Sequence, residues 1–265
     1  MRKTAVITGG SSGIGRATAA ILVSRGYMVY DLSRSENPQE GVCHIYCDVT
    51  QTKTVNEAFK LIAQKEEKGI DLLILCAGMG VAGSVEHTTD TEMIHQFDVN
   101  TFGPVRVVRQ ALPLLRKNAK TRPRRRIVFV SSMAAQFGIP FQSMYSATKA
   151  AINSIAFSLS NEVRSQNITV AVVMPGDVKT NFKRKTNLEG NDIYPNMKSA
   201  ISQMEHDEQN GLSAEAVAQR VVRAATRRHI SLFNTSDRLS TLECLLQRLL
   251  PTSVALYVVR KLYHC

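Results

Sequence analysis

The sequence is poor in cysteine, and its five cysteines are odd in number and scattered along 265 residues: Cys43, Cys47, Cys76, Cys244 and Cys265. A disulfide framework needs paired cysteines in a short secreted chain, so that class of protein is excluded. Cys43 and Cys47 lie four residues apart, but without a second ligand pair they do not make a zinc site. We expect free, mostly buried thiols and no bound metal.

Long apolar runs are also missing. No stretch reaches the roughly 18 uninterrupted apolar residues of a membrane-spanning helix. Residues 2–8 are apolar enough for the core of a signal peptide, but glycines end the run at once and no cleavage-like site follows. The sequence therefore predicts a cytoplasmic protein without a transmembrane segment, long enough for one large α/β domain.

Acidic residues are scarce, with 22 Asp and Glu against 33 Lys and Arg, which gives a net charge of +11. Seven of the cations crowd into one segment around Pro123: Arg116, Lys117, Lys120, Arg122, Arg124, Arg125 and Arg126. Such a cluster could meet nucleic acid or an acidic membrane. Because no aromatic residues are interleaved with it, we favour a solvated loop and expect no nucleic-acid partner.

Apolar runs of strand type alternate with segments of helical period throughout the chain. The strands expected are Thr4–Thr8, Met28–Leu32, His44–Cys47, Asp71–Cys76, Ile127–Ser131, Thr169–Met174 and, more weakly, His229–Phe233. The helices expected are Ile14–Arg25, Thr52–Lys68, Thr101–Lys117, Ser146–Ser165 and Ala214–Arg227. This order predicts a single Rossmann-type, doubly wound α/β domain, with about seven parallel strands and helices on both faces.

Two segments depart from this alternation. Residues 181–210 are polar and poor in strand signal, which is typical of a lid over a substrate site. Residues 239–265 place leucines at helical spacing and are broken by Pro251. We expect this tail to be a helical extension packed on the domain of residues 1–238, with a protein partner or a membrane surface as the alternative.

The first expected strand runs into a glycine-rich turn with the pattern T-G-x-x-x-G-x-G. Glycines at Gly9, Gly13 and Gly15 allow the backbone to turn tightly and to approach a pyrophosphate closely. Ser11, Ser12 and Ile14 complete the turn, and the helix that follows would offer free N–H groups to the phosphates. The turn alone is weak evidence for a nucleotide.

Tyr145 and Lys149 lie four residues apart, and therefore on one face of an expected helix. A free tyrosine has a pKa near ~10 and is a poor base at neutral pH. A neighbouring lysine charge favours the phenolate, so this pair could act as a general acid or base.

These motifs, in this order, resemble the short-chain dehydrogenase/reductase family. The resemblance implies a catalytic tetrad of Asn100, Ser132, Tyr145 and Lys149, with Ser132 bonded to the substrate oxygen and Asn100 holding a water for proton relay. It also implies cofactor contacts from Asp48, Val49, Ala77, Gly78, Pro175, Gly176, Val178 and Thr180, besides the glycine turn, Asn100, Tyr145 and Lys149. Cys76 stands where the family usually has asparagine.

The residues at the end of the second strand decide the choice of cofactor. An acidic side chain there usually holds the free ribose of NAD, whereas an arginine holds the 2′-phosphate of NADP. Ser33 occupies the acidic position of the family and Arg34 follows it, which predicts NADP (NADPH). The alternative makes Asp31 or Glu36 the ribose ligand.

The expected activity is hydride transfer between NADPH and a ketone or secondary alcohol, with Tyr145 as general acid/base. Met133, Phe137, Phe141, Met144 and Phe182 would form an apolar pocket for a small hydrophobic substrate, as in hydroxysteroid dehydrogenases or carbonyl reductases. The alternatives are a ketoacyl-ester reductase and a catalytically silent NADP sensor. The resemblance also implies a homodimer or homotetramer through helices Thr101–Lys117 and Ser146–Ser165.

Overall fold

The fold is built around one parallel seven-stranded sheet, with the strand order β11-β7-β6-β4-β1-β2-β3. The computed structural model describes residues 2–117, 125–180, 182 and 184–264. The strands of the sheet are β1 (Thr4–Thr8), β2 (Met28–Ser33), β3 (Val42–Tyr46), β4 (Leu72–Leu75), β6 (Arg125–Val130), β7 (Ile168–Met174) and β11 (Phe233–Thr235). Neighbouring β1 and β4 lead to opposite halves of the sheet, which creates a topological switch point at their carboxyl ends.

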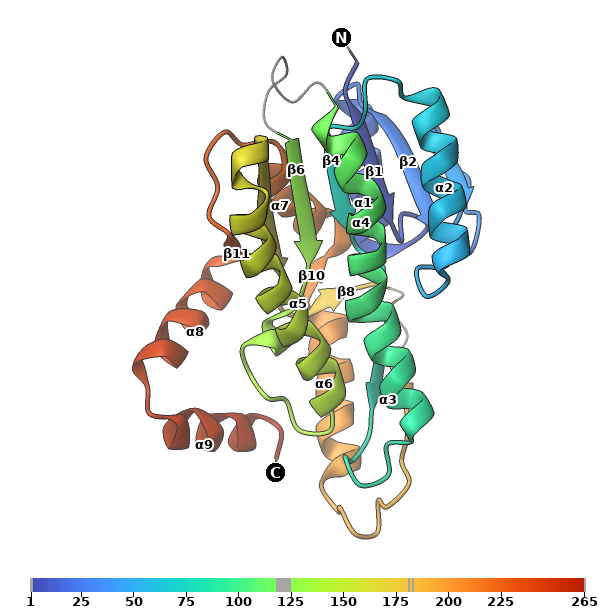
Figure 1. The fold of residues 1–265 in the computed structure, drawn as a ribbon. Helices are drawn as coiled ribbons and strands as arrows, with labels where there is room; N and C mark the ends of the chain where they lie inside the picture. The colour runs from blue at the N-terminus through green and yellow to red at the C-terminus, as the bar shows by residue number, and fades with distance from the viewer. Residues whose placement is uncertain (1, 118–124, 181, 183, 265) are drawn as a thin grey trace.

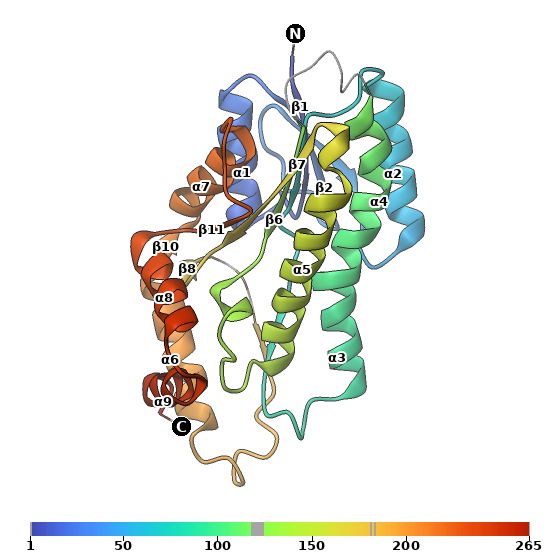
Figure 2. The same ribbon diagram turned by 60° about the vertical axis from the view of Figure 1, so that its left-hand side comes forward.

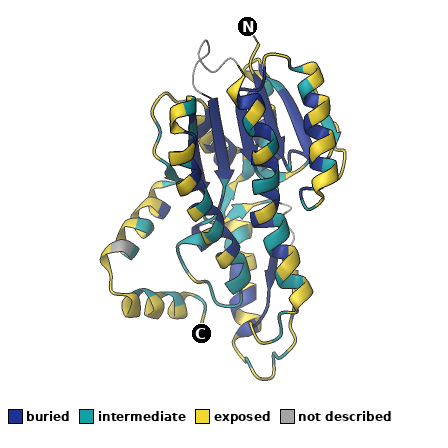
Figure 3. Cartoon of the chain, viewed as in Figure 1, coloured by how far each residue is buried: buried dark blue, intermediate teal, exposed yellow. Residues whose placement is uncertain are grey.

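Helices cover both faces of this sheet (Figures 1 and 2). One face packs on α1 (Gly13–Ser24) and α7 (Ala214–Thr226), and the other on α2 (Thr52–Lys65), α4 (Gly103–Arg116) and α5 (Ser143–Glu162). The five inner strands are almost continuously buried, as parallel strands between two helical layers must be, whereas the edge strands β3 and β11 are partly exposed (Figure 3). The predicted α/β fold is confirmed.

The weakest strand prediction was misplaced. β11 begins at Phe233 and not at His229, because its pairing with Val172–Met174 of β7 selects only Phe233–Thr235. A helix, α3 (Asp90–Phe97), was missed altogether, although Thr89 and Glu92 form a capping box at its start. A π-helical turn, Asp98–Phe102, joins α3 to α4.

The predicted lid contains more regular structure than its polarity suggested. A short strand, β9 (Arg184–Thr186), pairs with β5 (Gly80–Ala82), and α6 (Met197–Asn210) follows. The helix buries Met197, Ala200, Ile201 and Met204, whose spacing forms one apolar stripe. A second short pair, β8 (Val178–Lys179) with β10 (Leu212–Ser213), closes the segment.

The basic cluster is not a uniformly solvated loop. Arg125 and Arg126 open β6 and are buried: Arg125 pairs with Asp71, and Arg126 bonds to Thr169 and to the Ala224 carbonyl. Buried arginines persist only when paired in this way. Arg116 and Lys117 are exposed, while Lys120, Arg122 and Arg124 lie outside the described residues.

The tail forms two helices, α8 (Arg238–Leu249) and α9 (Thr252–Leu262), that extend along the edge of the domain (Figures 1 and 2). Asp237 caps α8 through the Ser240 amide, and Gln247 donates to the Gln136 carbonyl. α9 buries none of its residues. Among the described residues, no helix has the length and apolar character needed to cross a bilayer.

Candidate active site

A single large cavity of about 1550 Å³ lies beyond the carboxyl ends of the central strands. Its walls combine the glycine turn after β1, the ends of β2, β4, β6 and β7, helix α5 and the tail helices. In an open α/β sheet this edge, at the switch point, is where ligands bind. The topology therefore places the predicted motifs in one chamber.

The glycine turn is shaped for close approach of a ligand. Gly9 and Gly13 adopt positive φ values of 70° and 49°, and a Cβ at Gly15 would lie 2.2 Å from the Gly9 carbonyl oxygen. Ser12 precedes α1 and makes no side-chain capping bond, so it leaves the first N–H groups of the helix uncapped, and the residues of this first turn line the cavity. Ser11 and Ile14 line the cavity beside them. This is a cradle for a diphosphate.

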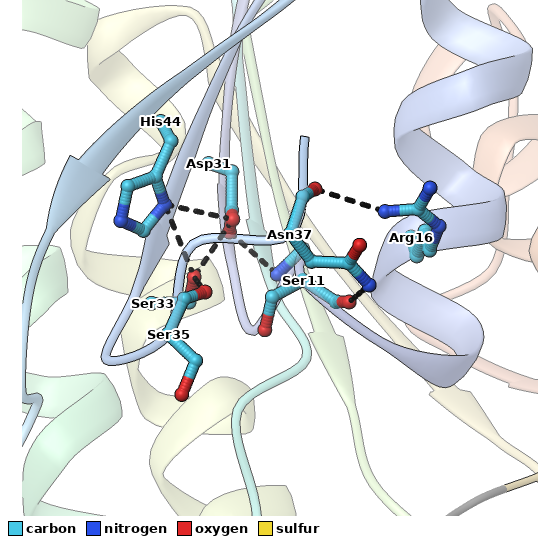
Figure 4. A network of polar contacts seen from close by, with 8 residues as sticks. Ser11, Arg16, Asp31, Ser33, Ser35, Asn37 and His44 are labelled. Atoms are coloured by element: carbon cyan, nitrogen blue, oxygen red, sulfur yellow. Dashed lines mark hydrogen bonds and ion pairs between the residues drawn. The ribbon is translucent and has the colours of Figure 1, made fainter. Parts of the chain in front are cut away.

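The end of β2 holds a buried polar network (Figure 4). Asp31 accepts hydrogen bonds from the Gly10 amide at 2.7 Å and from the Ser33 hydroxyl at 2.7 Å, and it contacts His44 at 3.3 Å. Its carboxylate thus fixes the glycine turn and does not face the cavity. Arg34 and Glu36 are exposed at the cavity wall. Among these residues, Arg34 supplies the free cation.

The loop after β2 is also tied to the glycine turn. Arg16 donates to the carbonyls of Asn37 and Pro38, and the Asn37 side chain donates to the Ser11 carbonyl at 2.8 Å (Figure 4). These bonds hold the short loop that contains Arg34 beside the glycine turn. Sequence reasoning missed this clamp, since its acceptors are backbone carbonyls.

The remaining predicted cofactor residues border the same cavity. Asp48 binds the amide and hydroxyl of Thr50, so its carboxylate shapes the loop before α2, and Val49 lies at the wall. Ala77 and Gly78 follow β4, and the Ala77 amide donates to the Thr8 hydroxyl. Burial raises the pKa of the neighbouring Cys76 thiol to about 12.

The loop after β7 reaches back to the glycine turn. Pro175, Gly176, Val178 and Thr180 all line the cavity. A Cβ on Gly13 would lie 3.6 Å from the Thr180 side chain, so the two loops almost touch. The Pro175 carbonyl accepts from the Met133 amide at 2.8 Å, which couples this loop to the segment after β6.

Ser132, Tyr145 and Lys149 meet in the middle of the cavity. Ser132 follows β6, its hydroxyl accepts a hydrogen bond from the Ala134 amide at 3.1 Å, and it is near enough to Tyr145 to lower the pKa of that hydroxyl. The Lys149 ammonium lies 5.7 Å from the centre of the Tyr145 ring and donates to the Val130 carbonyl at 3.2 Å. One turn of α5 thus presents both residues to the strand end, as their spacing predicts.

Asn100 lies behind this group. It is buried in the π-helical turn, and its side-chain amide bonds to both the amide and the carbonyl of Met79, each at 2.8 Å. It does not line the cavity. A Cβ on Gly78 would lie 3.4 Å from its oxygen and 3.6 Å from the Lys149 nitrogen, so Asn100 and Lys149 are near neighbours.

The pKa values of Tyr145 and Lys149 differ from the expectation that the lysine charge favours the phenolate. Burial raises the pKa of Tyr145, while the Ser132 hydrogen bond and the charge of Arg184 oppose the rise. Burial also lowers the pKa of Lys149 to about 8, partly offset by Cys76. A protonated tyrosine is the form that donates a proton to a carbonyl oxygen. The raised pKa therefore keeps the Tyr145 hydroxyl protonated at neutral pH.

The part of the cavity near Tyr145 carries several large apolar side chains. Met133, Phe137 and Phe182 line it as predicted, and the Phe182 ring lies 6.4 Å from that of Tyr145. Phe141 and Met144 do not line it. Phe141 turns away, with a φ of 57°, and packs against Tyr194 and α6.

The cavity gains wall residues that the sequence did not reveal. Met204 comes from α6, and Leu246, Leu250, Val258 and Leu262 come from the tail. Near them, Arg184 pairs with Glu208, and burial raises the pKa of Asp177. The helical spacing of the tail leucines was visible in the sequence, but nothing there indicated that one face would border a cavity.

Comparison with known proteins agrees with this geometry. Residues 3–191 match the family described as short chain dehydrogenase. A 3-ketodihydrosphingosine reductase of Bacteroides thetaiotaomicron is 32% identical over 84% of both chains. A probable short-chain type dehydrogenase/reductase, VdlC, of Helicobacter pylori is 37% identical over 82% of both chains.

A solved structure extends the agreement to the whole fold. A short-chain dehydrogenase from Streptomyces avermitilis superposes with a TM-score of 0.84 at 26% identity, over 98% of this chain and 96% of that one. The fold and site define a dinucleotide-binding α/β protein. The chain belongs to the short-chain dehydrogenase family and is an oxidoreductase acting on CH–OH groups.

Proposed function

We propose that the protein is an NADP(H)-dependent oxidoreductase that interconverts a hydrophobic ketone and its secondary alcohol. The observation that carries this proposal is the meeting of Ser132, Tyr145 and Lys149 in one cavity with the glycine turn. NADPH supplies the hydride when it is bound. The residues of the turn fit its diphosphate, because the glycines leave room for a close approach and the first turn of α1, which Ser12 does not cap, lines the cavity.

The protein residues provide the proton and hold the reacting oxygen. The Ser132 and Tyr145 hydroxyls, which both lie at the cavity wall, would bracket the carbonyl oxygen of the substrate. Tyr145 donates its proton as negative charge develops there, and its raised pKa keeps that proton available. Lys149 then stabilises the resulting phenolate by charge. We assign Asn100 to holding Lys149 in place, because it fixes the loop around Met79 and donates to the hydroxyl of Thr148, the residue before Lys149 on α5.

The cavity favours a ketone on a long apolar chain. Phe137, Ile139, Met204 and the tail leucines extend the wall well beyond the tetrad. The Bacteroides relative is named for a lipid ketone. Phe141, one of the residues predicted to form a pocket like that of hydroxysteroid dehydrogenases, does not border the cavity, which weakens the case for a steroid. A ketoacyl ester is the second candidate, because its acyl chain would fit the same wall.

Consumption of NADPH across a panel of ketones tests the proposal. Long-chain aliphatic ketones should react faster than steroid ketones and short soluble ketones. Faster turnover of a ketoacyl thioester would favour the second candidate. Absence of turnover with every ketone, despite saturable binding of NADPH, would leave the chain as a silent cofactor sensor and contradict the proposal.

Cofactor preference is expected to depend on Arg34. A guanidinium can hold a 2′-phosphate through two parallel N–H contacts, worth roughly 1.5–3 kcal/mol, or about one to two decades of preference for NADP. Arg34→Ala should therefore lower kcat/KM for NADPH by that factor and leave the value for NADH almost unchanged. Lys53→Ala, on α2 and outside the cavity, is the matched control. A wild type that prefers NADH would contradict the assignment.

We propose that the protein assembles as a dimer or tetramer through α4 and α5. The outer face of α5 exposes Ala147, Ala150, Ser154 and Phe157 at helical spacing. Arg106, which could have marked a solvated face, is instead paired with Asp98 at 2.6 Å. Light scattering at micromolar concentration should show at least a dimer, and Ala150→Arg should reduce it to a monomer. A monomeric wild type would overturn this proposal.

We also propose that the 181–210 segment acts as a lid. Phe182 contacts the Tyr145 ring, and α6 carries Met204 to the cavity wall. Closing over substrate would exclude water from Tyr145. Amide hydrogen exchange in α6 should slow when NADPH and a substrate analogue bind together. Equal protection with and without both ligands would argue against a lid.

A further inference from the structure

The tail helices α8 and α9 each have two apolar sides, and only one of the two is directed toward the rest of the protein. Leu246, Leu250, Val258 and Leu262 border the cavity. Leu242, Leu245 and Leu249 recur on the other face of α8, and α9 continues it with Leu256 and Tyr257; all five are at least half exposed. Figure 3 shows that both helices lie almost entirely at the surface. No other described element covers this outer face.

A basic groove begins where the tail leaves the domain. This groove, of about 840 Å³, lies between α1 and α7, and Ser236 and Asp237, the residues before α8, also line it. Four exposed arginines line it: Arg25, Arg220, Arg223 and Arg227. In Figure 2, α1, α7, α8 and α9 lie along the same side of the molecule. The tail itself has four cations, Arg238, Arg248, Arg260 and Lys261, and one acid, Glu243.

From this combination we infer that the outer face of α8 and α9 docks on the surface of an anionic lipid bilayer, with the arginine groove against its headgroups. Helices of 12 and 11 residues are about 18 Å and 16 Å long, too short for a core of ~30 Å, so they would lie in the interface. Exposed leucines then enter the acyl region while neighbouring cations meet the phosphates.

Charge favours a bilayer over a second copy of the chain as the occupant. A symmetric contact through this face would bring the groove and tail arginines of two copies close together. An anionic membrane relieves that repulsion and also covers the leucines. Docking would place the tail helices between the cavity and the lipid. The inference does not depend on which ketone is reduced.

The test is vesicle flotation with the full-length wild-type protein. We expect binding to phosphatidylcholine vesicles that contain roughly one phosphatidylglycerol in four, and weak binding to pure phosphatidylcholine. Leu249→Asp with Leu256→Asp should weaken partitioning by at least about tenfold. Arg220→Glu with Arg223→Glu should weaken it by about fivefold or more for each arginine, with steep salt dependence.

Two control variants make the same chemical changes elsewhere. Leu61→Asp with Val85→Asp alters exposed apolar residues away from the tail, and Lys53→Glu with Lys60→Glu reverses two exposed charges on α2. Both should bind vesicles like the wild type. Equal losses in the controls, or equal binding to neutral and anionic vesicles, would overturn the inference.

Two further readouts separate the remaining outcomes. If the tail variant lowers the oligomeric mass in light scattering and the wild type does not float, the occupant is a second copy and the inference is wrong. NADPH turnover of a short soluble ketone should be unchanged in all four variants. Its absence in the wild type, with flotation intact, would contradict the proposed function and leave the docking surface standing.

Discussion

Tyr145→Phe is expected to lower turnover by roughly 10²–10⁴-fold, because it removes the hydroxyl that donates the proton while keeping the ring. NADPH affinity should change little, since the phosphate cradle and Arg34 lie at the other end of the cavity. Steady-state kinetics with a reactive ketone and fluorescence titration of NADPH would measure the two effects separately.

The matched control is Tyr194→Phe. The Tyr194 hydroxyl donates to Glu86 at 2.8 Å, and Tyr194 does not line the cavity. The same loss of one hydroxyl there should leave kcat within a factor of about two. If Tyr145→Phe retains activity within a factor of a few of the wild type, Tyr145 is not the proton donor.

Lys149→Met is expected to change how stability depends on pH. In the unfolded chain Lys149 titrates near its ordinary 10.5, whereas burial lowers its pKa to about 8 in the folded protein. Below pH 8 both states hold the proton, so the folded wild type carries the full cost of the buried charge. Between pH 8 and 10.5 that cost fades, and the wild type should gain about 3 kcal/mol relative to the variant.

Urea denaturation of both proteins at several pH values measures this difference. At pH 7 the variant should be more stable than the wild type, because it lacks the buried charge. This gain is reduced by the roughly 1 kcal/mol lost with the hydrogen bond to the Val130 carbonyl. Lys53→Met, at an exposed lysine, should show a difference that is constant with pH. A constant difference for Lys149→Met as well would mean that Lys149 keeps its ordinary pKa.

Much of the fold could be predicted because its strands are buried on both faces. Six of the seven strands of the sheet were predicted to within a few residues, since continuous apolar runs such as Leu72–Leu75 are easily recognised in the sequence. β11 was misplaced because pairing with β7, a tertiary constraint, selects its residues. The motifs that carry the predicted family resemblance, from Gly9 to Thr180, all lie within the matched range of 3–191.

The site was predictable where the chemistry is local in sequence. Gly9, Gly13 and Gly15, and the pair Tyr145 and Lys149, were readable from spacing alone. Their roles remain predictions, but the structure brings them together around one cavity. Residues placed by long-range packing were not readable. Phe141 leaves the cavity through a positive φ, and Arg125 looked solvated because its partner Asp71 is distant in sequence.

The segment of residues 181–210 shows a third limit. Its low apolar content concealed α6, which needs only Met197, Ala200, Ile201 and Met204 to pack. A helix that buries one narrow stripe carries little average hydrophobicity, so composition is the wrong measure for it.

The position of Asp31 restricts how this protein could evolve or be redesigned toward NAD. The usual exchange, an acidic residue in place of Ser33, would put a second carboxylate next to Asp31, whose bond from Ser33 it would also remove. Two carboxylates at hydrogen-bond distance repel, and the Gly10 amide would lose its fixed acceptor if Asp31 moved. A single acidic substitution at Ser33 would therefore not convert the protein to NAD. Any such conversion would first need substitutions that rebuild the link between β2 and the glycine turn.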